Sequence, residues 1–506
     1  MPAEHMLGID IGTSGCKVVV TTQNGFVRGA ASENYETYSL KPTWAEQNPA
    51  DWVLAARKAV KNALTKADLK RSDLGSICVD GMSNCPVFLD TKGSVLRPAI
   101  MWMDRRRIPE KTRLMRRIRK SIPRKTANFL SPISTLSKVL WIMKYERSVW
   151  RRTYNVLMPK DYIVYRLTQE WSTDFSDASG TLLSSERQGK PIWSEEVCEP
   201  VGISIRKLPT ILPSMGKVGY VTKKGAREMG LPKGVPVAAG CADAAADCLA
   251  AGTVSPGQRM IRLGTCGAVH LVLGKLPKGL TSKYFALYHC VPGRRFIQLI
   301  SPCGLAHKWF SEVFFGKQTK RDCKTSSFKS IEDLATKAPV GSEGLLFHPY
   351  VSGEHSVRGA NLKGGFFGLS LNHGKAHFAR AVLEGIAFSI KDCFRTIQKV
   401  VPSNEPVRLM GGGTKSSLWM RIIADVLGVK IAKPRYEGAS FGASLLGGIS
   451  VGFFKNYHEA VEQCVIIEKV IKPNAENNRK YERLYVAYEK SHSNPSEAYN
   501  MLGEIT

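Results

Sequence analysis

A glycine-rich turn between two short apolar runs is the feature that most restricts how this chain can fold. The runs at residues 7–11 and 18–20 predict β-strands, because branched side chains favour a pleated surface. Gly12 and Gly15 lie between them, allow backbone angles that other residues resist, and leave room for a ligand beside the main chain. The sequence therefore predicts either a plain β-hairpin with one exposed acid or a hairpin that binds phosphate.

Side chains in and beside this turn suit a phosphate and a metal ion. Thr13, Ser14 and the nearby backbone N–H groups can face a phosphate, and Lys17 adds positive charge. Asp10 ends the first run, where a carboxylate can hold Mg²⁺ directly or through water. The turn lacks the Gly-Lys-Ser/Thr ending of a Walker loop, and the strand that follows it distinguishes it from a dinucleotide-binding GxGxxG motif.

A second stretch repeats this plan. Residues 260–273 consist of an apolar run, the turn Gly264-Thr265-Cys266-Gly267 and another apolar run. The repeat indicates two halves of one duplicated fold. The second turn has no acid that matches Asp10, so we predict that it contacts phosphate without a metal.

Length and composition place the chain among globular proteins with two large domains. It has 506 residues, of which 43% are hydrophobic, as in soluble proteins with buried cores. No signal peptide is recognisable, and no apolar run is long enough to span a membrane. The 12 cysteines are scattered without a CxxC pair. We therefore expect a cytoplasmic protein with reduced thiols and no membrane attachment.

The formal net charge of +29 raises the question of a nucleic-acid partner. The basic residues are dispersed, apart from a dense run that begins at Arg105 and continues to Lys120. That run has helical spacing and little aromatic interleaving. We interpret it as a solvated surface and expect no specific nucleic-acid site.

The order of elements predicts an α/β fold. Asn48 and Pro49 predict the start of a helix that runs to about residue 66. Residues 99–104 are predicted to form a strand of the first sheet that ends at Asp104, and residues 105–122 a helix.

The second half of the chain is predicted to begin near Asp243. An apolar run at residues 235–239 precedes this acid, and a helix of small residues follows it. Residues 317–330 are polar and basic and predict a surface loop. We expect an N-terminal domain at residues 1–245 and a C-terminal domain at residues 246–506.

Several stretches resemble the signatures of the FGGY family of carbohydrate kinases. Residues 364–369 and 377–385 resemble the second signature, including Glu384, and residues 135–142 resemble the first, although Tyr145 departs from the polar residue usual at its end. Further matching blocks follow in family order at residues 10–17, 44–52, 96–104, 240–243, 264–267, 411–413 and 439–448. Within the family the chain most resembles the xylulokinases.

The resemblance implies the fold of the actin, hexokinase and Hsp70 superfamily. That fold has two duplicated actin-like (ribonuclease H-like) domains, each with a mixed sheet flanked by helices, and an active-site cleft between them. The resemblance also implies phosphorylation of a sugar hydroxyl with ATP and Mg²⁺, by a protein for which a homodimer is one possible assembly.

Asp243 has two interpretations. From the residues alone it is equally suited to cap the following helix or to accept a proton from a substrate hydroxyl. The family's catalytic aspartate occupies the matching position. The resemblance therefore implies that Asp243 is the catalytic base and contacts the substrate.

The nucleotide site is predicted at a run of three glycines after the strand at residues 407–410. Backbone N–H groups at a helix start favour anions. By resemblance, Gly412 and Gly413 approach the ATP phosphates, and Ser416 or Ser417 lies near the adenosine. Gly264 and Thr265 would touch the β- and γ-phosphates.

The sugar site is predicted from Asp104 and a neighbouring tripeptide. A carboxylate holds pairs of hydroxyls well through its two acceptor oxygens. Many xylulokinases have Met-His where this chain has Met82, Ser83 and Asn84, and they commonly have Asn where it has Ala244. These departures leave a ketopentose such as xylulose as the first expectation. Ribulose, a pentitol or glycerol remains an alternative within the family, and a non-catalytic sugar or nucleotide sensor remains one outside it.

Overall fold

The computed structural model describes residues 4–106, 122, 128–277, 284–316, 327–351 and 362–493. Its contacts divide the chain into two compact units. Unit 1 comprises residues 1–255, 273–296 and 436–466, and unit 2 comprises residues 256–272, 297–435 and 467–506. The chain thus returns to unit 1 at residues 436–466, after most of unit 2. The sequence-based division into one domain at residues 1–245 and another at residues 246–506 stays a prediction.

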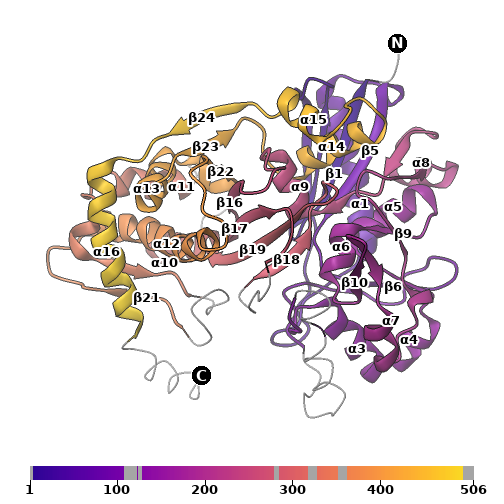
Figure 1. Ribbon diagram of the computed structural model, residues 1–506, viewed down its shortest axis with the longest axis horizontal. Coiled ribbons are helices and arrows are strands. Elements are labelled where there is room, and N and C mark those ends of the chain that lie inside the picture. The colour runs from indigo at the N-terminus through magenta and orange to yellow at the C-terminus, as the bar shows by residue number, and fades with distance from the viewer. Residues whose placement is uncertain are drawn as a thin grey trace. The chain divides into compact units, whose positions relative to one another are not determined.

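The described part of the chain contains both strands and helices along its whole length (Figure 1). The strands are β1 His5–Ile11, β2 Gly15–Thr21, β3 Val27–Asn34, β4 Glu46–Gln47, β5 Leu74–Gly81, β6 Val87–Leu89, β7 Ala99–Ile100, β8 Asn155–Leu157, β9 Ser172–Asp174, β10 Ser184–Arg187, β11 Lys190–Trp193, β12 Thr210–Leu212, β13 Lys217–Tyr220, β14 Pro236–Ala238, β15 Cys241–Ala242, β16 Arg259–Leu263, β17 Cys266–Leu273, β18 Phe285–Tyr288, β19 Arg295–Pro302, β20 Leu346–His348, β21 Gly365–Phe367, β22 Val407–Met410, β23 Ile431–Pro434 and β24 Ile467–Ile471. The helices are α1 Pro49–Ala67, α3 Thr135–Tyr145, α4 Arg147–Arg152, α5 Pro159–Thr168, α6 Phe175–Gly180, α7 Glu195–Cys198, α8 Lys223–Met229, α9 Asp243–Ala250, α10 Gly304–Phe315, α11 Ser327–Ala335, α12 Lys375–Gln398, α13 Ser417–Leu427, α14 Ala439–Ser450, α15 Tyr457–Cys464 and α16 Ala475–Ser493.

The main sheet of unit 1 has the strand order β13-β14-β5-β1-β2-β3, with β15 also paired to β5. β1 pairs with β2 in antiparallel and with β5 in parallel orientation. Residues 6–11 of β1 are all buried, and so are residues 76–81 of β5. Strands that are buried on both faces require near-continuous apolar runs, which explains the apolar run at residues 7–11.

Helices α1 and α14 cover opposite faces of this sheet. Gly8 on β1 lies against α14, because a Cβ there would be 1.9 Å from the Ser440 carbonyl oxygen. Gly29 on β3 lies against α1, because a Cβ there would be 2.2 Å from the Ala63 carbonyl oxygen. Since Gly8 pairs with Val19 and Gly29 with Val20, the two glycines point to opposite faces.

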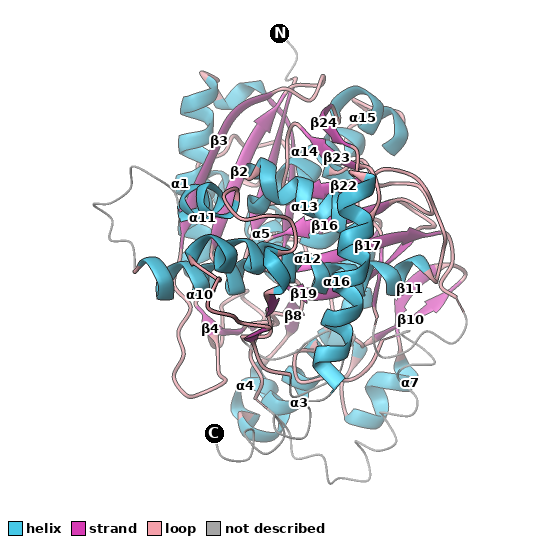
Figure 2. Ribbon diagram, turned by 90° about the vertical axis from the view of Figure 1, so that its left-hand side faces the viewer, coloured by secondary structure: helices cyan, strands magenta, loops and turns pink. Residues whose placement is uncertain are grey.

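Unit 2 repeats the same plan with the strand order β19-β17-β16-β22-β23-β24. β16 pairs antiparallel with β17 and parallel with β22, as β1 does with β2 and β5. β22 and β23 are parallel and β23 and β24 antiparallel, which matches β5, β14 and β13. Figure 2 shows α16 beside α12 and α13, over the strands of this unit. The structure confirms the predicted duplicated α/β fold.

Two expectations about individual elements are wrong. β7 is only two residues long and pairs with β4 in a separate small sheet, so Asp104 does not end a strand of the main sheet. Helix α11 begins at Ser327, inside the stretch that we expected to be a loop. Residues 317–326 lie outside the described part of the chain, and so do residues 107–121 of the predicted helix at residues 105–122. Arg105 and Arg106 are described and belong to no helix.

Helix α1 begins as predicted. Asn48 is its N-cap and accepts a hydrogen bond from the Ala50 N–H, and Pro49 lies in the first turn. Among the described residues, no helix has both the length and the apolar character needed to cross a bilayer.

Candidate active site

The carbonyl groups of the first glycine-rich turn are bound by the rest of unit 1. The Tyr35 hydroxyl donates a hydrogen bond to the Gly12 carbonyl, and the Tyr35 N–H donates to the Ser14 carbonyl over 3.4 Å. The Gln47 amide nitrogen donates to the Thr13 carbonyl over 2.8 Å. Three successive carbonyl oxygens of the turn are therefore held by donors from residues outside it.

This arrangement fixes where the amide groups of the turn point. In a planar trans peptide the C=O and the following N–H point in opposite directions. The N–H groups of Thr13, Ser14 and Gly15 therefore point away from Tyr35 and Gln47. Successive backbone N–H groups that point in the same direction form a concave binding site for an anion.

The donors that hold the turn are themselves held. Gln47 accepts a hydrogen bond from the Trp52 indole N–H over 2.9 Å and donates to the Thr37 hydroxyl over 2.7 Å. The Trp102 indole N–H donates to the Thr13 hydroxyl oxygen over 3.0 Å, which orients that hydroxyl. The contact of Gln47 with the turn could not be predicted from the sequence, because it joins residues more than 30 positions apart.

The second turn is held in the same way within unit 2. Helix α10 donates two N–H groups of its first turn, from Gly304 to the Gly264 carbonyl over 3.0 Å and from Leu305 to the Thr265 carbonyl over 2.9 Å. By the same peptide geometry, the N–H groups of Thr265 and Cys266 point away from α10. The turn is one residue tighter than the first, since Leu263 pairs with Gly267 whereas Ile11 pairs with Cys16.

Two carboxylates of unit 1 fit the chemistry predicted for them. Asp10 is 4% exposed, and its Oδ2 lies 3.4 Å from the Lys17 ammonium group. Asp243 is the first residue of α9 and remains partly exposed, with its Oδ1 accepting a hydrogen bond from the Ala244 N–H over 2.8 Å. The N-cap of α9 is Ala242, so Asp243 does not occupy the cap position that was the alternative interpretation.

The tripeptide predicted on the sugar side is anchored by its neighbours. The Ser83 hydroxyl donates to Asp177 over 2.7 Å, and Met82 is 2% exposed. Asn84 has a left-handed backbone with φ 60°, and its side-chain oxygen accepts two hydrogen bonds from Thr135, from the N–H over 3.2 Å and from the hydroxyl over 3.0 Å. The Lys138 ammonium group binds the Asn84 carbonyl. The first family signature, which contains Thr135 and Lys138, thus fixes the backbone of this tripeptide.

A buried ionic network beneath Ser83 could not be read from the sequence. Lys160 is fully buried and contacts Asp161, with its Nζ 3.1 Å from Asp174 and 3.4 Å from Asp177. Burial opposes the charge on Lys160, but the three carboxylates outweigh it and hold the pKa of the lysine well above its usual value. The network fixes Asp177 and, through it, Ser83. These residues come from α5, β9 and α6, which only the tertiary structure brings together.

Asp104 is already fully engaged. It is buried, and its two oxygens accept hydrogen bonds from the Ala45 N–H over 2.7 Å, from the Arg106 N–H over 2.9 Å and from the Arg106 guanidinium over 2.9 and 2.7 Å. Glu46 also binds Arg106, over 2.7 Å. This geometry explains the burial of Asp104 as part of a network, and its contact with sugar stays a prediction.

The glycines predicted to bind the nucleotide differ from one another. They belong to a short 3₁₀ turn, Gly412–Lys415, between β22 and α13. A Cβ on Gly413 would lie 2.7 Å from the Leu263 Cβ and 2.9 Å from the Trp419 ring, so packing requires this glycine. A Cβ on Gly412 would have nothing within 4 Å, so that position is open. Ser416 is buried and caps α13 by accepting a hydrogen bond from the Trp419 N–H over 3.0 Å.

Glu384 of the second family signature is a structural residue of unit 2. Its carboxylate accepts hydrogen bonds from the Gly341 N–H and the Ser342 hydroxyl, each over 2.9 Å, and from Arg380 and the Tyr481 hydroxyl, each over 2.8 Å. Four donors from α12, α16 and the turn before β20 meet on one side chain. The signature is therefore explained here by packing rather than by ligand contact.

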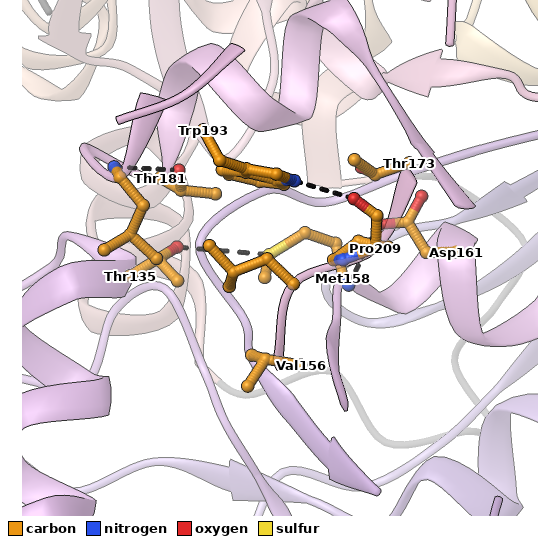
Figure 3. Close-up of a pocket in the computed structure, with 10 residues that line it drawn as sticks. Thr135, Val156, Met158, Asp161, Thr173, Thr181, Trp193 and Pro209 are labelled. Carbon is orange, nitrogen blue, oxygen red and sulfur yellow. Dashed lines mark hydrogen bonds between the residues drawn. The ribbon is translucent and has the colours of Figure 1, made fainter. Parts of the chain in front are cut away.

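The pocket shown in Figure 3 is too small for a sugar. It lies in unit 1 between Thr135, Met158 and Trp193, where the Trp193 indole N–H donates to the Pro209 carbonyl over 2.7 Å. Its volume of about 10 Å³ is roughly that of one water molecule. It is a packing void behind the first signature helix.

Two family models together match most of the chain. The model for the N-terminal domain of the FGGY family of carbohydrate kinases matches residues 5–250, and the model for its C-terminal domain matches residues 260–451.

Individual relatives match over nearly the whole length. Xylulose kinase of Staphylococcus epidermidis is 32% identical over 495 residues, which cover 97% of this chain and 96% of that protein. Xylulose kinase of Bacillus subtilis is 30% identical and covers 96% of each chain. The crystal structure of xylulose kinase from Rhodospirillum rubrum superposes with a TM-score of 0.85 at 27% identity, over 98% of this chain and 100% of that one.

Proposed function

Since the chain belongs to the FGGY family of carbohydrate kinases, we propose that it transfers the γ-phosphoryl group of ATP to a hydroxyl of the ketopentose xylulose. The names of the relatives that match over nearly full length support this acceptor.

The observation that carries the proposal is the shared construction of the two glycine-rich turns. In each turn the carbonyl groups are bound from behind, by Tyr35 and Gln47 in the first and by the start of α10 in the second. Both turns therefore present N–H groups that suit the oxygens of a phosphate. Phosphoryl transfer needs positioned donors of this kind, because its catalysis rests on orientation and charge stabilisation.

In this proposal Asp243 is the general base. Its carboxylate is partly exposed at the start of α9, and the hydrogen bond from the Ala244 N–H orients it. The sugar hydroxyl loses its proton to Asp243 as its oxygen bonds to the γ-phosphorus, and the bond from that phosphorus to the β,γ-bridging oxygen breaks to release ADP. We assign Met82, Ser83, Asn84 and Asp104 to the sugar side of the same unit.

Asp10 is the residue that we assign to Mg²⁺. Its Oδ1 is buried and has no hydrogen-bond donor among the described residues, which suits a cation ligand. A bound Mg²⁺ would neutralise negative charge on the phosphates. Lys17, Thr13 and Ser14 would add further contacts to the same phosphates, whereas Gly264, Thr265, Gly412, Gly413 and Ser416 would contact the nucleotide from unit 2.

The test is a coupled ADP-release assay with the purified full chain, MgATP and a panel of acceptors. The panel contains D-xylulose, D- and L-ribulose, ribitol, xylitol, glycerol and hexoses. We expect the highest kcat/KM with D-xylulose. A preference for ribulose, a pentitol or glycerol would replace the acceptor but keep the reaction, and the absence of sugar-stimulated ADP release would point to a non-catalytic sensor.

A further inference from the structure

A fully buried aspartate lies next to Asp10 in the middle of the main sheet of unit 1. Asp80 is on β5, and the pairing of β1 with β5 sets it directly beside Asp10. Residues in register on neighbouring parallel strands lie on the same face, about 4.8 Å apart. The side chains of Asp10 and Asp80 therefore share one face of the sheet.

The two side chains lack the donors that buried carboxylates normally have. Asp80 is 0% exposed, and neither of its oxygens has a hydrogen-bond donor among the residues that the structure describes. Asp10 uses Oδ2 for Lys17, which stands on the other side of it in register on β2, and its Oδ1 also lacks a donor there. Three donorless carboxylate oxygens thus belong to two neighbouring residues.

The surroundings make the charge more costly rather than less. Lys17 is in register with Asp10 and forms its ion pair with that residue, and its side chain is 58% exposed. A buried carboxylate without a partner is strongly unfavourable, and such groups are usually paired or bound to a metal.

We infer that Asp80 is a second carboxylate of the magnesium site and that the ion binds between its oxygens and Oδ1 of Asp10. This inference rests on the proposed function, because it takes Asp10 to be the metal-binding residue. Mg²⁺ commonly binds through one or two carboxylates and completes its shell with water and substrate phosphates, so this pair is sufficient.

The position explains why the signal was missed in the sequence. Asp80 stands in a buried apolar strand and no motif accompanies it. Only the register between β1 and β5, which are separated by more than 60 residues, brings it next to Asp10. A strand interior is also where an unpaired acid is least expected.

The experiment measures metal binding directly and needs no sugar. The full chain is titrated with Mn²⁺, and free Mn²⁺ is counted by electron paramagnetic resonance, without nucleotide and with ADP. The variants are Asp80→Asn, Asp80→Ser and Asp10→Asn, which remove charge from the pair. Asp90→Asn is the matched control, because Asp90 lies in a surface turn whose N–H groups from Lys92 and Ser94 an asparagine can also bind.

We expect Asp80→Asn and Asp80→Ser to weaken Mn²⁺ binding by about tenfold or more, as changes around metal ligands do, and Asp90→Asn to leave it unchanged. Wild-type Mn²⁺ affinity in both Asp80 variants would overturn the inference and leave Asp80 as a protonated buried acid. Anomalous scattering from Mn²⁺ in crystals of the wild-type protein gives an answer that does not depend on the variants folding. A peak bonded to an Asp80 oxygen supports the inference, and a peak remote from Asp80 contradicts it.

The result is separable from the proposed function. A protein that binds Mn²⁺ through Asp80 but phosphorylates no acceptor in the panel would refute the kinase proposal and keep the metal site. If the protein phosphorylates xylulose and the Asp80→Asn variant binds Mn²⁺ with wild-type affinity, the kinase proposal is kept and the metal site at Asp80 is refuted.

Discussion

At the scale of single residues, Trp102 shows how one hydrogen bond can position a predicted phosphate ligand. Its indole N–H binds the Thr13 hydroxyl, and its backbone N–H donates to the Cys85 sulfur over 3.1 Å, next to the predicted sugar-binding tripeptide. Through its side chain and its backbone, Trp102 therefore connects the turn to the residue that follows that tripeptide. Its role is to position Thr13 rather than to react.

Removing this N–H should weaken nucleotide use. Trp102→Phe keeps an aromatic ring and loses the bond to Thr13, and one hydrogen bond contributes about 1 kcal/mol, so KM for ATP should rise about fivefold. Trp171→Phe is the control, because Trp171 packs on Tyr165 at a centroid distance of 4.2 Å. Steady-state kinetics at varied ATP distinguish the two, and equal KM values for both variants would show that the bond to Thr13 has no functional effect.

His307 should make the stability of the protein sensitive to acid. It is buried against the Trp419 ring at a centroid distance of 5.6 Å, and burial lowers its pKa from 6.5 to about 4. The unfolded chain therefore takes up a proton between pH 6.5 and 4 that the folded chain does not. Stability is lost as the pH falls through this window, by about 3 kcal/mol in total.

The measurement is urea unfolding at pH 7 and pH 4.5. His307→Phe keeps a ring against Trp419 and has no group to protonate, so the loss of unfolding free energy between the two pH values should be smaller than in wild type. An equal loss in both proteins would exclude His307 as its source.

At the scale of elements, the 3₁₀ turn Gly412–Lys415 contains one glycine that we assign to packing, Gly413, and one that we assign to phosphate binding, Gly412. Gly413→Ala should destabilise the fold by about 1–3 kcal/mol, because the new Cβ would overlap Leu263 and Trp419. Gly412→Ala should change stability by less than about 0.5 kcal/mol and raise KM for ATP, since the space it fills is open in the protein.

Thermal unfolding and ATP titration of both variants test this assignment. If Gly412→Ala destabilised the protein as much as Gly413→Ala, the open space at residue 412 would have to be rejected. If it left KM for ATP unchanged, the turn would not contact the phosphates at that residue.

The elements that the sequence predicted are those specified by local signals. The turn at residues 12–15 and helix α1 each carry their glycine or capping residues within a few positions. What the sequence could not supply are the contacts between distant segments, such as Gln47 on Thr13 or Lys160 on three aspartates. β7 was overestimated because an apolar run of buried residues looks like a strand, although only Ala99 and Ile100 find a partner.

Contacts between distant segments also decide which site residues could be predicted from the sequence. Asp10 and Asp243 were found because each follows an apolar strand beside glycine or small residues. Asp80 was not, because its meaning depends on register alone. Asp104 was found, but its engagement by Arg106 and Ala45 became visible only in the structure.

At the scale of the whole molecule, we expect the net charge of +29, whose basic residues are dispersed, to have no role in the proposed reaction. Dispersed lysine and arginine should give weak, salt-sensitive adhesion to DNA without sequence preference. Fluorescence anisotropy with several unrelated 20-base-pair duplexes, at low salt and at 0.15 M salt, checks this. We expect similar affinities for all duplexes and a steep loss with salt, and selective binding of one duplex at 0.15 M salt would contradict it.

The duplicated sheets give the molecule two turns that we predict to bind phosphate, but the acids that we assign to the reaction lie in one unit. Asp10, Asp80 and Asp243 all belong to unit 1, and the turn of unit 2 has no acid at the position of Asp10. The central claim is therefore that unit 1 supplies the chemistry of a sugar kinase and that Asp243 is its base.

The turnover of Asp243→Asn tests this claim most directly. The variant keeps the size of the side chain and removes the proton acceptor, so ADP release with saturating D-xylulose and MgATP should fall by about 10²–10⁴-fold. Binding of ATP, measured by calorimetry, should change little, because the turns and Gly412 would hold the phosphates. A turnover close to that of the wild-type protein would contradict the assignment of Asp243 as the base.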